Sequence, residues 1–144
     1  MVIREKGQSR LVYFPGDVGR TSWRSGHTDL SRLLQNSIRW LSGGDAPVTV
    51  AGDGVIESFA WETGAGFAFH VLNYTNPAMH KGSIRRFYPI GPRKVRMKLP
   101  AARKVSRVEL LRAEKDLPFR HANAAIEFTI PSVVDYEIAA MYSE

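Results

Sequence analysis

The stretch YFPGDVGRTSW holds side chains of the types that bind small polar ligands. Asp17 offers a carboxylate, Arg20 a guanidinium and Trp23 a flat ring, and His27 follows four residues later. The Pro-Gly pair directly before Asp17 predicts a turn, so we expect a loop that leaves a strand and precedes a helix. Because loops often present binding side chains, these four residues form the candidate ligand-binding site.

Two carboxylates that stand two positions apart, Asp135 and Glu137, could share one face of a strand. Glycoside hydrolysis needs a pair of carboxyl groups about 5 to 9.5 Å apart across a sugar. Carboxylates are seldom buried, so the pattern favours two solvent-facing residues that lie opposite Tyr136 and Ile138. We therefore assign no catalytic residue in this chain.

The histidines give no metal-ligand pattern. They lack the HExxH arrangement and other short ligand spacings, and the chain has no cysteine; they are His27, His70, His80 and His121. His70 alternates with apolar residues in a strand-like run, which predicts a partly buried, hydrogen-bonded side chain. No glycine-rich loop of the nucleotide-binding type is followed by a helix. We expect neither a metal nor another cofactor.

Three tryptophans could stack on sugar rings, which requires an exposed aromatic platform. Trp40 lies beside the apolar stripe of a predicted helix, and Trp61 lies in a strand-like run between Ala60 and Glu62. Both are predicted to be packed. Trp23 differs, because its predicted loop can present the ring to a ligand.

The net charge of +6 is concentrated in one segment. Residues 81–112, from Lys81 to Arg112, hold eleven Lys or Arg and a single acid, Glu109. The alternation in KVRMKL favours a strand with one solvated face, and polyanion binding through this basic face is the alternative. Nucleic acid is not expected, because aromatic side chains for base stacking are not interleaved with the basic ones. The polar start and the lack of an apolar run of about 18 residues predict a cytoplasmic protein without a membrane span.

The elements change character near Gly43. A short strand over 11–14 precedes a helical pattern in which apolar residues recur every three or four positions, from Leu30 to Leu41. Strand-like runs separated by turns follow, at 48–51, 55–62, 67–74, 94–99, 104–113, 125–130 and 135–142. Such spacing predicts an antiparallel β-sandwich. We divide the chain into residues 1–43, a strand, loop and helix too small for an α/β domain, and a sandwich over 46–144.

The first part, SRLVYFPGDVGRTSW followed by HTDLSRLLQNSIRWLSG, resembles the closing strand and helix of an amidotransferase-like domain. That domain is the β-galactosidase trimerisation domain, which is found in certain glycoside hydrolases, including α-L-fucosidase-like relatives. The later stretches PVTVAGDGVIESFAWETGAGFAFHVLNYTNP, PIGPRKVRMKLP, VSRVELL and IPSVVDYEIAAM resemble the small β-sandwich that ends such chains.

The resemblance implies a catalytic (β/α)8 barrel upstream of Met1, and hence a non-catalytic, C-terminal accessory and assembly portion here. It also implies partners: a second copy of the chain or the missing upstream domains. The alternative functions are a stand-alone carbohydrate-binding module and, after that, a polyanion-binding domain. An unpaired strand and an apolar helix stripe would favour an oligomer.

Overall fold

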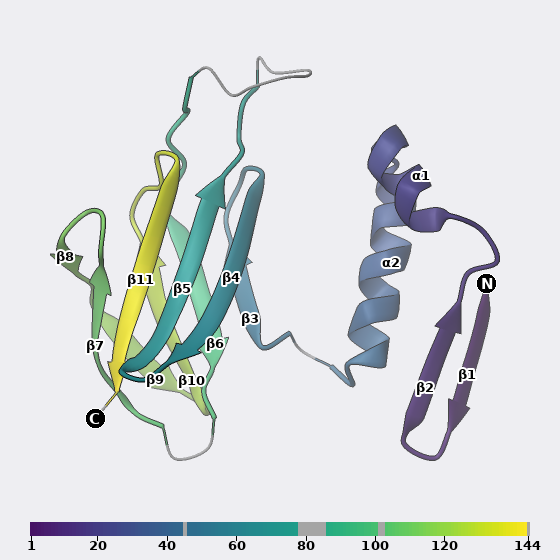
Figure 1. The fold of residues 1–144 in the computed structure, drawn as a ribbon, viewed down its shortest axis with the longest axis horizontal. Helices are drawn as coiled ribbons and strands as arrows, with labels where there is room; N and C mark the ends of the chain where they lie inside the picture. The colour runs from purple at the N-terminus through teal and green to yellow at the C-terminus, as the bar shows by residue number, and fades with distance from the viewer. Residues whose placement is uncertain (45, 78–85, 101–102, 144) are drawn as a thin grey trace. The chain divides into compact units, whose positions relative to one another are not determined.

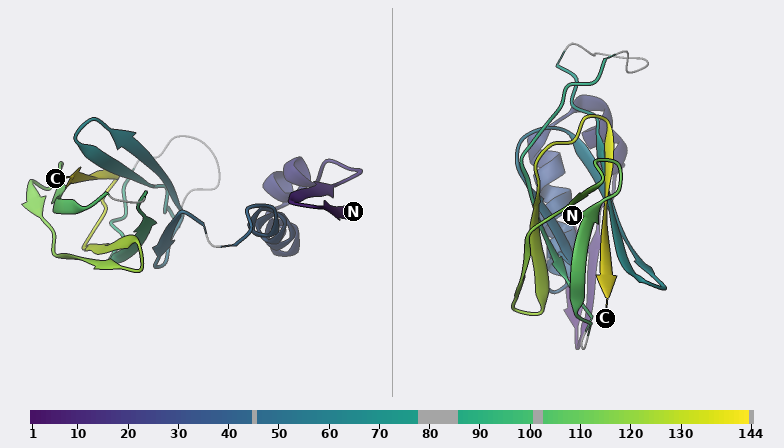
Figure 2. Two further views of the ribbon diagram at one scale, coloured as in Figure 1. Left: turned by 90° about the horizontal axis from the view of Figure 1, so that it is seen from below. Right: turned by 90° about the vertical axis from the view of Figure 1, so that its left-hand side faces the viewer.

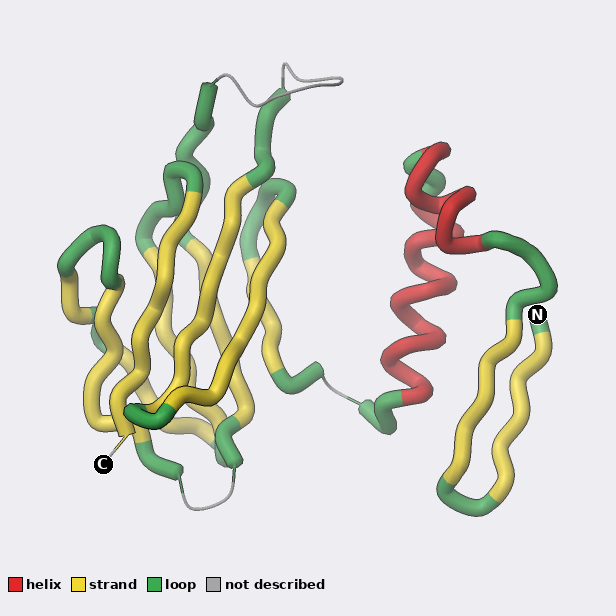
Figure 3. Tube along the Cα trace, viewed as in Figure 1, coloured by secondary structure: helices red, strands yellow, loops and turns green. Residues whose placement is uncertain are grey.

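The computed structural model describes residues 1–144 apart from 45, 78–85, 101–102 and 144 (Figure 1). The chain divides into two compact units, Met1–Ala46 and Pro47–Glu144. Within the described residues, both helices belong to the first unit, and the second is built of strands (Figure 3). The fold is mainly β, with antiparallel sheets, as the spacing of the strand-like runs predicted.

The first unit is a β-hairpin followed by two helices. Strands β1 (Val2–Lys6) and β2 (Ser9–Tyr13) pair antiparallel, and Gly7 turns the chain between them with a φ of +60°. Helices α1 (Val18–Ser25) and α2 (Thr28–Leu41) come next. The two helices touch through a hydrogen bond between two serine hydroxyls, Ser22 and Ser31, 2.9 Å apart.

The prediction of a lone strand over 11–14 was wrong, because β1 precedes β2 and pairs with all of it. The sequence did not predict β1, because the residues of VIREK are exposed on both faces of the hairpin and show no apolar alternation. The helix over 28–41 is confirmed, and Gly43 follows it with a φ of +75°. Arg10 ties the hairpin to this helix: its guanidinium donates to the carbonyl of Trp40 at 2.8 Å and lies over the Trp40 ring.

The second unit stacks two antiparallel sheets face to face (Figure 2). One sheet has the order β3-β6-β10-β9, and the other has the order β4-β5-β11-β7-β8. The strands are β3 (Val48–Ala51), β4 (Ile56–Thr63), β5 (Gly66–Asn73), β6 (Arg93–Lys98), β7 (Val105–Leu110), β8 (Lys115–Asp116), β9 (Phe119–Ala122), β10 (Ala125–Ile130) and β11 (Tyr136–Ser143).

The core lies between the two sheets and is formed by alternate residues of the central strands. In β5 the buried side chains are those of Phe67, Phe69, Val71 and Asn73, while the residues between them are half-buried. The ring of Phe69 meets that of Phe128 edge-on across the sheets, with centroids 6.2 Å apart. Such alternation is what a sandwich requires, since each strand has one inward and one outward face.

The seven predicted strand runs are confirmed, each within a few residues of its bounds except 104–113, which ends at Leu110. Two short strands were missed: β8, which has two residues, and β9, whose sequence FRHA carries no strand pattern. In β6 the alternation of KVRMKL is confirmed, because Val95 and Met97 are buried and Lys94 and Lys98 are exposed.

Apolar burial is confined to the second unit. All buried hydrophobic residues in the described part of the chain lie between Phe67 and Met141. In the described residues of the first unit, Ser22 alone is buried. The first unit therefore has no hydrophobic core of its own, and its helices display apolar side chains such as Ile38, which is 65% exposed.

Candidate functional site

The predicted loop around Asp17 and Arg20 is the start of helix α1. Asp17 is the N-cap: its carboxylate accepts a hydrogen bond from the backbone N–H of Arg20 at 3.1 Å. The same carboxylate forms an ion pair with the Arg20 guanidinium, with an N–O distance of 2.9 Å. The loop prediction was wrong. The residues of GDVGRTSW are typical of a turn, but an aspartate is also a common N-cap, because its carboxylate can accept a hydrogen bond from the backbone N–H three residues later.

Trp23 lies on α1 and is 89% exposed, and His27 directly precedes α2 without a capping hydrogen bond from its side chain. All four predicted residues are exposed. Their ligand binding stays a prediction. Asp17 and Arg20 form an ion pair with each other, whereas the exposed side chains of Trp23 and His27 are not part of that pair.

The pair Asp135 and Glu137 does not form the solvent-facing pair that the sequence predicted. Glu137 is only 5% exposed, and its carboxylate accepts from the backbone N–H groups of Arg112 at 3.0 Å and Ile138 at 2.8 Å. Asp135 pairs with the Arg112 guanidinium, whose hydrogen bond holds the pKa of Asp135 below its usual value. Backbone donors offset the cost of burying Glu137, so both carboxylates serve structure.

An aromatic surface lies on the outer face of the five-stranded sheet. Residues directly opposite each other on paired strands share a face, so the strand register places the side chains. Phe59 of β4 lies opposite His70 of β5, and Leu72 of β5 lies opposite Tyr136 of β11. Trp61 is two residues from Phe59 and shares its face. We call these five residues the aromatic patch.

The aromatic patch lines a shallow pocket of about 420 Å³. Trp61 is 61% exposed and Phe59 47% exposed, so the prediction that Trp61 is packed was wrong. The reason is topological: β4 is an edge strand of its sheet, and Trp61 belongs to the set of residues that faces outward. The sequence did not predict this exposure, because both alternating sets of residues in VIESFAWE contain apolar side chains.

Polar atoms in the aromatic patch are held by one hydrogen bond. The Nδ1 atom of His70 lies 2.6 Å from the Tyr136 hydroxyl, and the two rings stack with centroids 5.9 Å apart. The expectation of a partly buried, hydrogen-bonded His70 is confirmed. The bond holds the ring through Nδ1, and no hydrogen bond to its other nitrogen, Nε2, is found among the described residues. The patch therefore combines flat rings with an imidazole and a hydroxyl, and the Arg112 guanidinium lies over its Tyr136 ring, 5.8 Å from the centroid.

Neither a metal site nor a membrane helix is found in the described part of the chain. No three His, Asp or Glu side chains within it cluster as metal ligands. His80 lies outside the described residues. Neither described helix is long and apolar enough to cross a membrane.

Comparison with known proteins gives a likeness in fold. No protein-family description matches the sequence, and no curated protein sequence matches it. The solved structure of α-L-fucosidase isoenzyme 2 from Paenibacillus thiaminolyticus is similar over 88% of this chain, with a TM-score of 0.74 and 17% sequence identity. The chain spans only 20% of the length of that fucosidase. Because the second unit alone is about two thirds of the chain, the match also takes in part of the first unit.

Proposed function

We propose that this chain is a non-catalytic accessory and assembly portion of a glycoside hydrolase-related protein. The observation that carries the proposal is the shared fold with a fifth of an α-L-fucosidase. The state of the two carboxylates supports it, because Asp135 and Glu137 are both engaged by Arg112 and the backbone. Residues 1–43 would then be the end of the amidotransferase-like domain that the sequence resembles.

Assembly is supported by the surface of the first unit. Large apolar side chains are exposed on its hairpin and helices, including Ile3, Leu11, Trp23, Ile38 and Leu41. With no core beneath them, these side chains gain stability by packing against another surface. The partner would be an upstream domain of the same protein or, when the chain stands alone, a second copy of it.

Light scattering on the full chain tests the assembly role. We expect a dimer or larger oligomer, and we expect Ile38→Lys to shift it toward monomer because a charge on the apolar stripe is costly to bury. Gln35→Lys adds the same charge at an exposed position of α2 and serves as the control. A monomer with residues 1–43 open to protease would contradict the assembly role.

An activity assay tests the non-catalytic role separately. The chain is incubated with nitrophenyl glycosides, including the α-L-fucoside. No release of nitrophenol above that of the buffer is expected. Turnover at the rate of an ordinary hydrolase would overturn the proposal.

The aromatic patch supports a second candidate function, the binding of a neutral carbohydrate. Sugars present apolar C–H faces that pack on flat rings, and hydroxyl groups that bond to a fixed polar atom. Trp61 and Phe59 supply exposed rings, and His70 supplies the nitrogen. The pocket volume of about 420 Å³ is within the range of small-ligand sites.

Titration with a panel of neutral oligosaccharides that includes α-L-fucosides tests this candidate. Trp61→Ala is expected to weaken binding at least about tenfold, as truncation of a central aromatic anchor does. Trp23→Ala removes an equally large exposed ring from α1 and is the matched control. Loss of binding in the Trp23 variant alone would instead place the site at α1, and no binding by the parent chain would end the carbohydrate candidate.

A further inference from the structure

The outer face of the four-stranded sheet collects basic side chains from strands that are distant in sequence. Arg96 of β6 lies opposite Glu127 of β10, which in turn lies opposite Arg120 of β9. Lys94 and Lys98 share the face of Arg96, because they stand two residues to either side on β6. We call these four cations and Glu127 the basic face.

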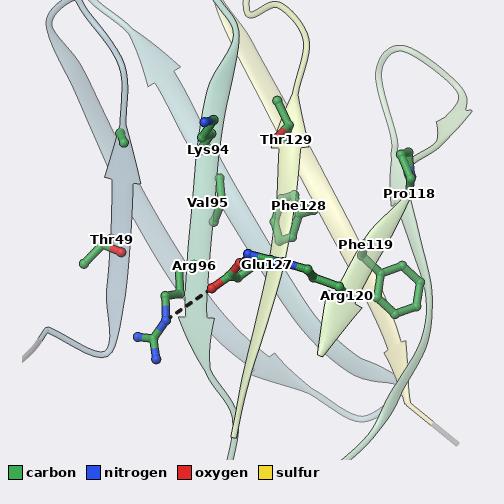
Figure 4. Close-up of a pocket in the computed structure, with 11 residues that line it drawn as sticks. Thr49, Lys94, Val95, Arg96, Pro118, Phe119, Arg120, Glu127, Phe128 and Thr129 are labelled. Atoms are coloured by element: carbon green, nitrogen blue, oxygen red, sulfur yellow. Dashed lines mark hydrogen bonds and ion pairs between the residues drawn. The ribbon is translucent and has the colours of Figure 1, made fainter. Parts of the chain in front are cut away.

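The basic face is hollowed. The polar residues that line a depression of about 590 Å³ are Lys94, Arg96, Arg120, Glu127, Thr49 and Thr129, and its apolar lining is Ala51, Val95, Pro118, Phe119 and Phe128. Figure 4 shows these side chains on neighbouring strands of the sheet. The hollow thus presents ammonium, guanidinium and hydroxyl groups toward the same space. These groups suit a ligand that carries both anionic groups and hydroxyls.

One acid neutralises only part of this charge. Glu127 forms ion pairs with Arg96 at 3.6 Å and with Arg120 at 2.6 Å. Lys94 is exposed and forms no ion pair with the described residues. Among the described residues that line the hollow, the three cations Lys94, Arg96 and Arg120 share the single carboxylate of Glu127, so an excess of positive charge remains. The Glu127 carboxylate also competes with an anionic ligand, because it already pairs with Arg96 and Arg120.

The spacing of the cations favours an extended ligand. Alternate residues of a strand are about 7 Å apart, so Lys94, Arg96 and Lys98 form a row of charges with that repeat. The two rings that line the hollow are largely covered: Phe128 is 4% exposed, and Phe119 is half-buried and packs against the core cluster. The face therefore lacks the exposed rings on which nucleic-acid bases stack.

We propose that the basic face binds an anionic polysaccharide, whose carboxylate or sulfate groups contact Lys94, Arg96 and Arg120. The threonine hydroxyls of Thr49 and Thr129 bond to the sugar hydroxyls. The choice of a glycan rests on the proposed role in a glycoside hydrolase-related protein. The choice of an anionic one rests on the charge and shape of this face alone. The site is separate from the aromatic patch, which lies on the other sheet.

Two substitutions with opposite expected effects test the proposal. Binding of the full chain to polygalacturonate and to heparin is measured by titration at low and at moderate salt. Lys94→Gln removes a cation and is expected to weaken binding about two- to fivefold, the scale of one exposed charge pair. Glu127→Gln frees two guanidinium groups and is expected to strengthen binding by a similar factor. Higher salt should weaken the binding of both polymers.

The controls separate this site from general attraction of charge. Lys115→Gln makes the same charge change on β8, in the other sheet, and is expected to leave affinity within experimental error. Dextran, which is neutral, should not bind at the basic face. Circular dichroism checks that each variant is folded. A gain in a Glu127→Gln variant that keeps the circular dichroism spectrum of the parent therefore does not arise from loss of structure.

The possible results of these titrations separate the proposed site from its alternatives. Equal losses in the Lys94 and Lys115 variants, or no gain in the Glu127 variant, would overturn the proposal. Tighter binding of single-stranded DNA than of either polysaccharide would replace the glycan with a nucleic acid. Preference for polygalacturonate or heparin identifies carboxylate or sulfate as the group bound. The Trp61→Ala variant should bind both polymers as the parent does, so failure of the neutral-sugar site and failure of this site are distinguishable.

Discussion

Asn73 is expected to be the most consequential polar side chain of the sandwich. It ends β5, is 4% exposed, and its amide donates to the carbonyls of Tyr88 at 2.8 Å, Val133 at 3.2 Å and Val134 at 2.7 Å. Its side-chain oxygen accepts from the N–H of Thr75 at 2.9 Å, which forms an Asx-type turn. One side chain thus joins three segments of the chain.

Asn73→Ala removes all four hydrogen bonds, while the buried carbonyl of Val133 keeps the N–H of Ile90 as a donor at 3.0 Å. Each bond contributes roughly 0.5 to 1.5 kcal/mol net, and the partly buried carbonyls regain water, so we expect a loss of about 2 to 4 kcal/mol. For a unit of this size that lowers Tm by roughly 10 to 25 °C. Thermal and urea unfolding followed by circular dichroism measures both.

Asn36→Ala deletes the same amide from an exposed position of α2 and is expected to change stability by less than about 0.5 kcal/mol. A change below about 1 kcal/mol for Asn73→Ala, equal to that of the control, would refute the reasoning. It would mean that water replaces the amide at all three carbonyls without cost.

Two further predictions concern the turn between β4 and β5 and the response to acid. Gly66→Ala should lower the free energy of unfolding by about 3 kcal/mol or more, because the φ of Gly66 is +146° and an added Cβ would clash with the Met141 carbonyl oxygen. Gly64→Ala in the same turn has open space around it and should change stability little. Asp135 has a lowered pKa through the hydrogen bond from Arg112, so its stabilising effect is present above its ordinary pKa of 3.8 and is lost as pH falls through the folded-state value. Asp135→Asn should therefore lower Tm more at pH 7 than in acid below pH 3.8, and an equal difference at both pH values would contradict this.

The regular strands were predictable because their residues alternate. In KVRMKL and AIEFTI one set of side chains is apolar and the other polar, and each set lies on its own side of the sheet. The hairpin strand β1 was not predictable in this way, since it has no buried face. The same holds for β9, whose four residues are half-buried or exposed.

The candidate sites depended on information that lies outside any local pattern. Trp61 and Phe59 are exposed because β4 has a neighbour on one side only, and strand order is a property of the whole sheet. Glu137 is buried because the backbone of Arg112, twenty-five residues away, brings a donor to it. The sequence next to Trp61, Phe59 and Glu137 contains neither the strand order of the sheet nor the donor from Arg112.

The sequence by itself determined the class of fold, seven strands of the sandwich, the helix over 28–41 and the excess of positive charge, since these follow from composition and from the period of apolar residues. Tertiary structure decided which side chains meet. Strand order and register placed His70 beside Tyr136, and set Arg120 and Arg96 on either side of Glu127. The physical reason is that side-chain period fixes only which face a residue occupies, whereas pairing between distant strands fixes its neighbours on that face.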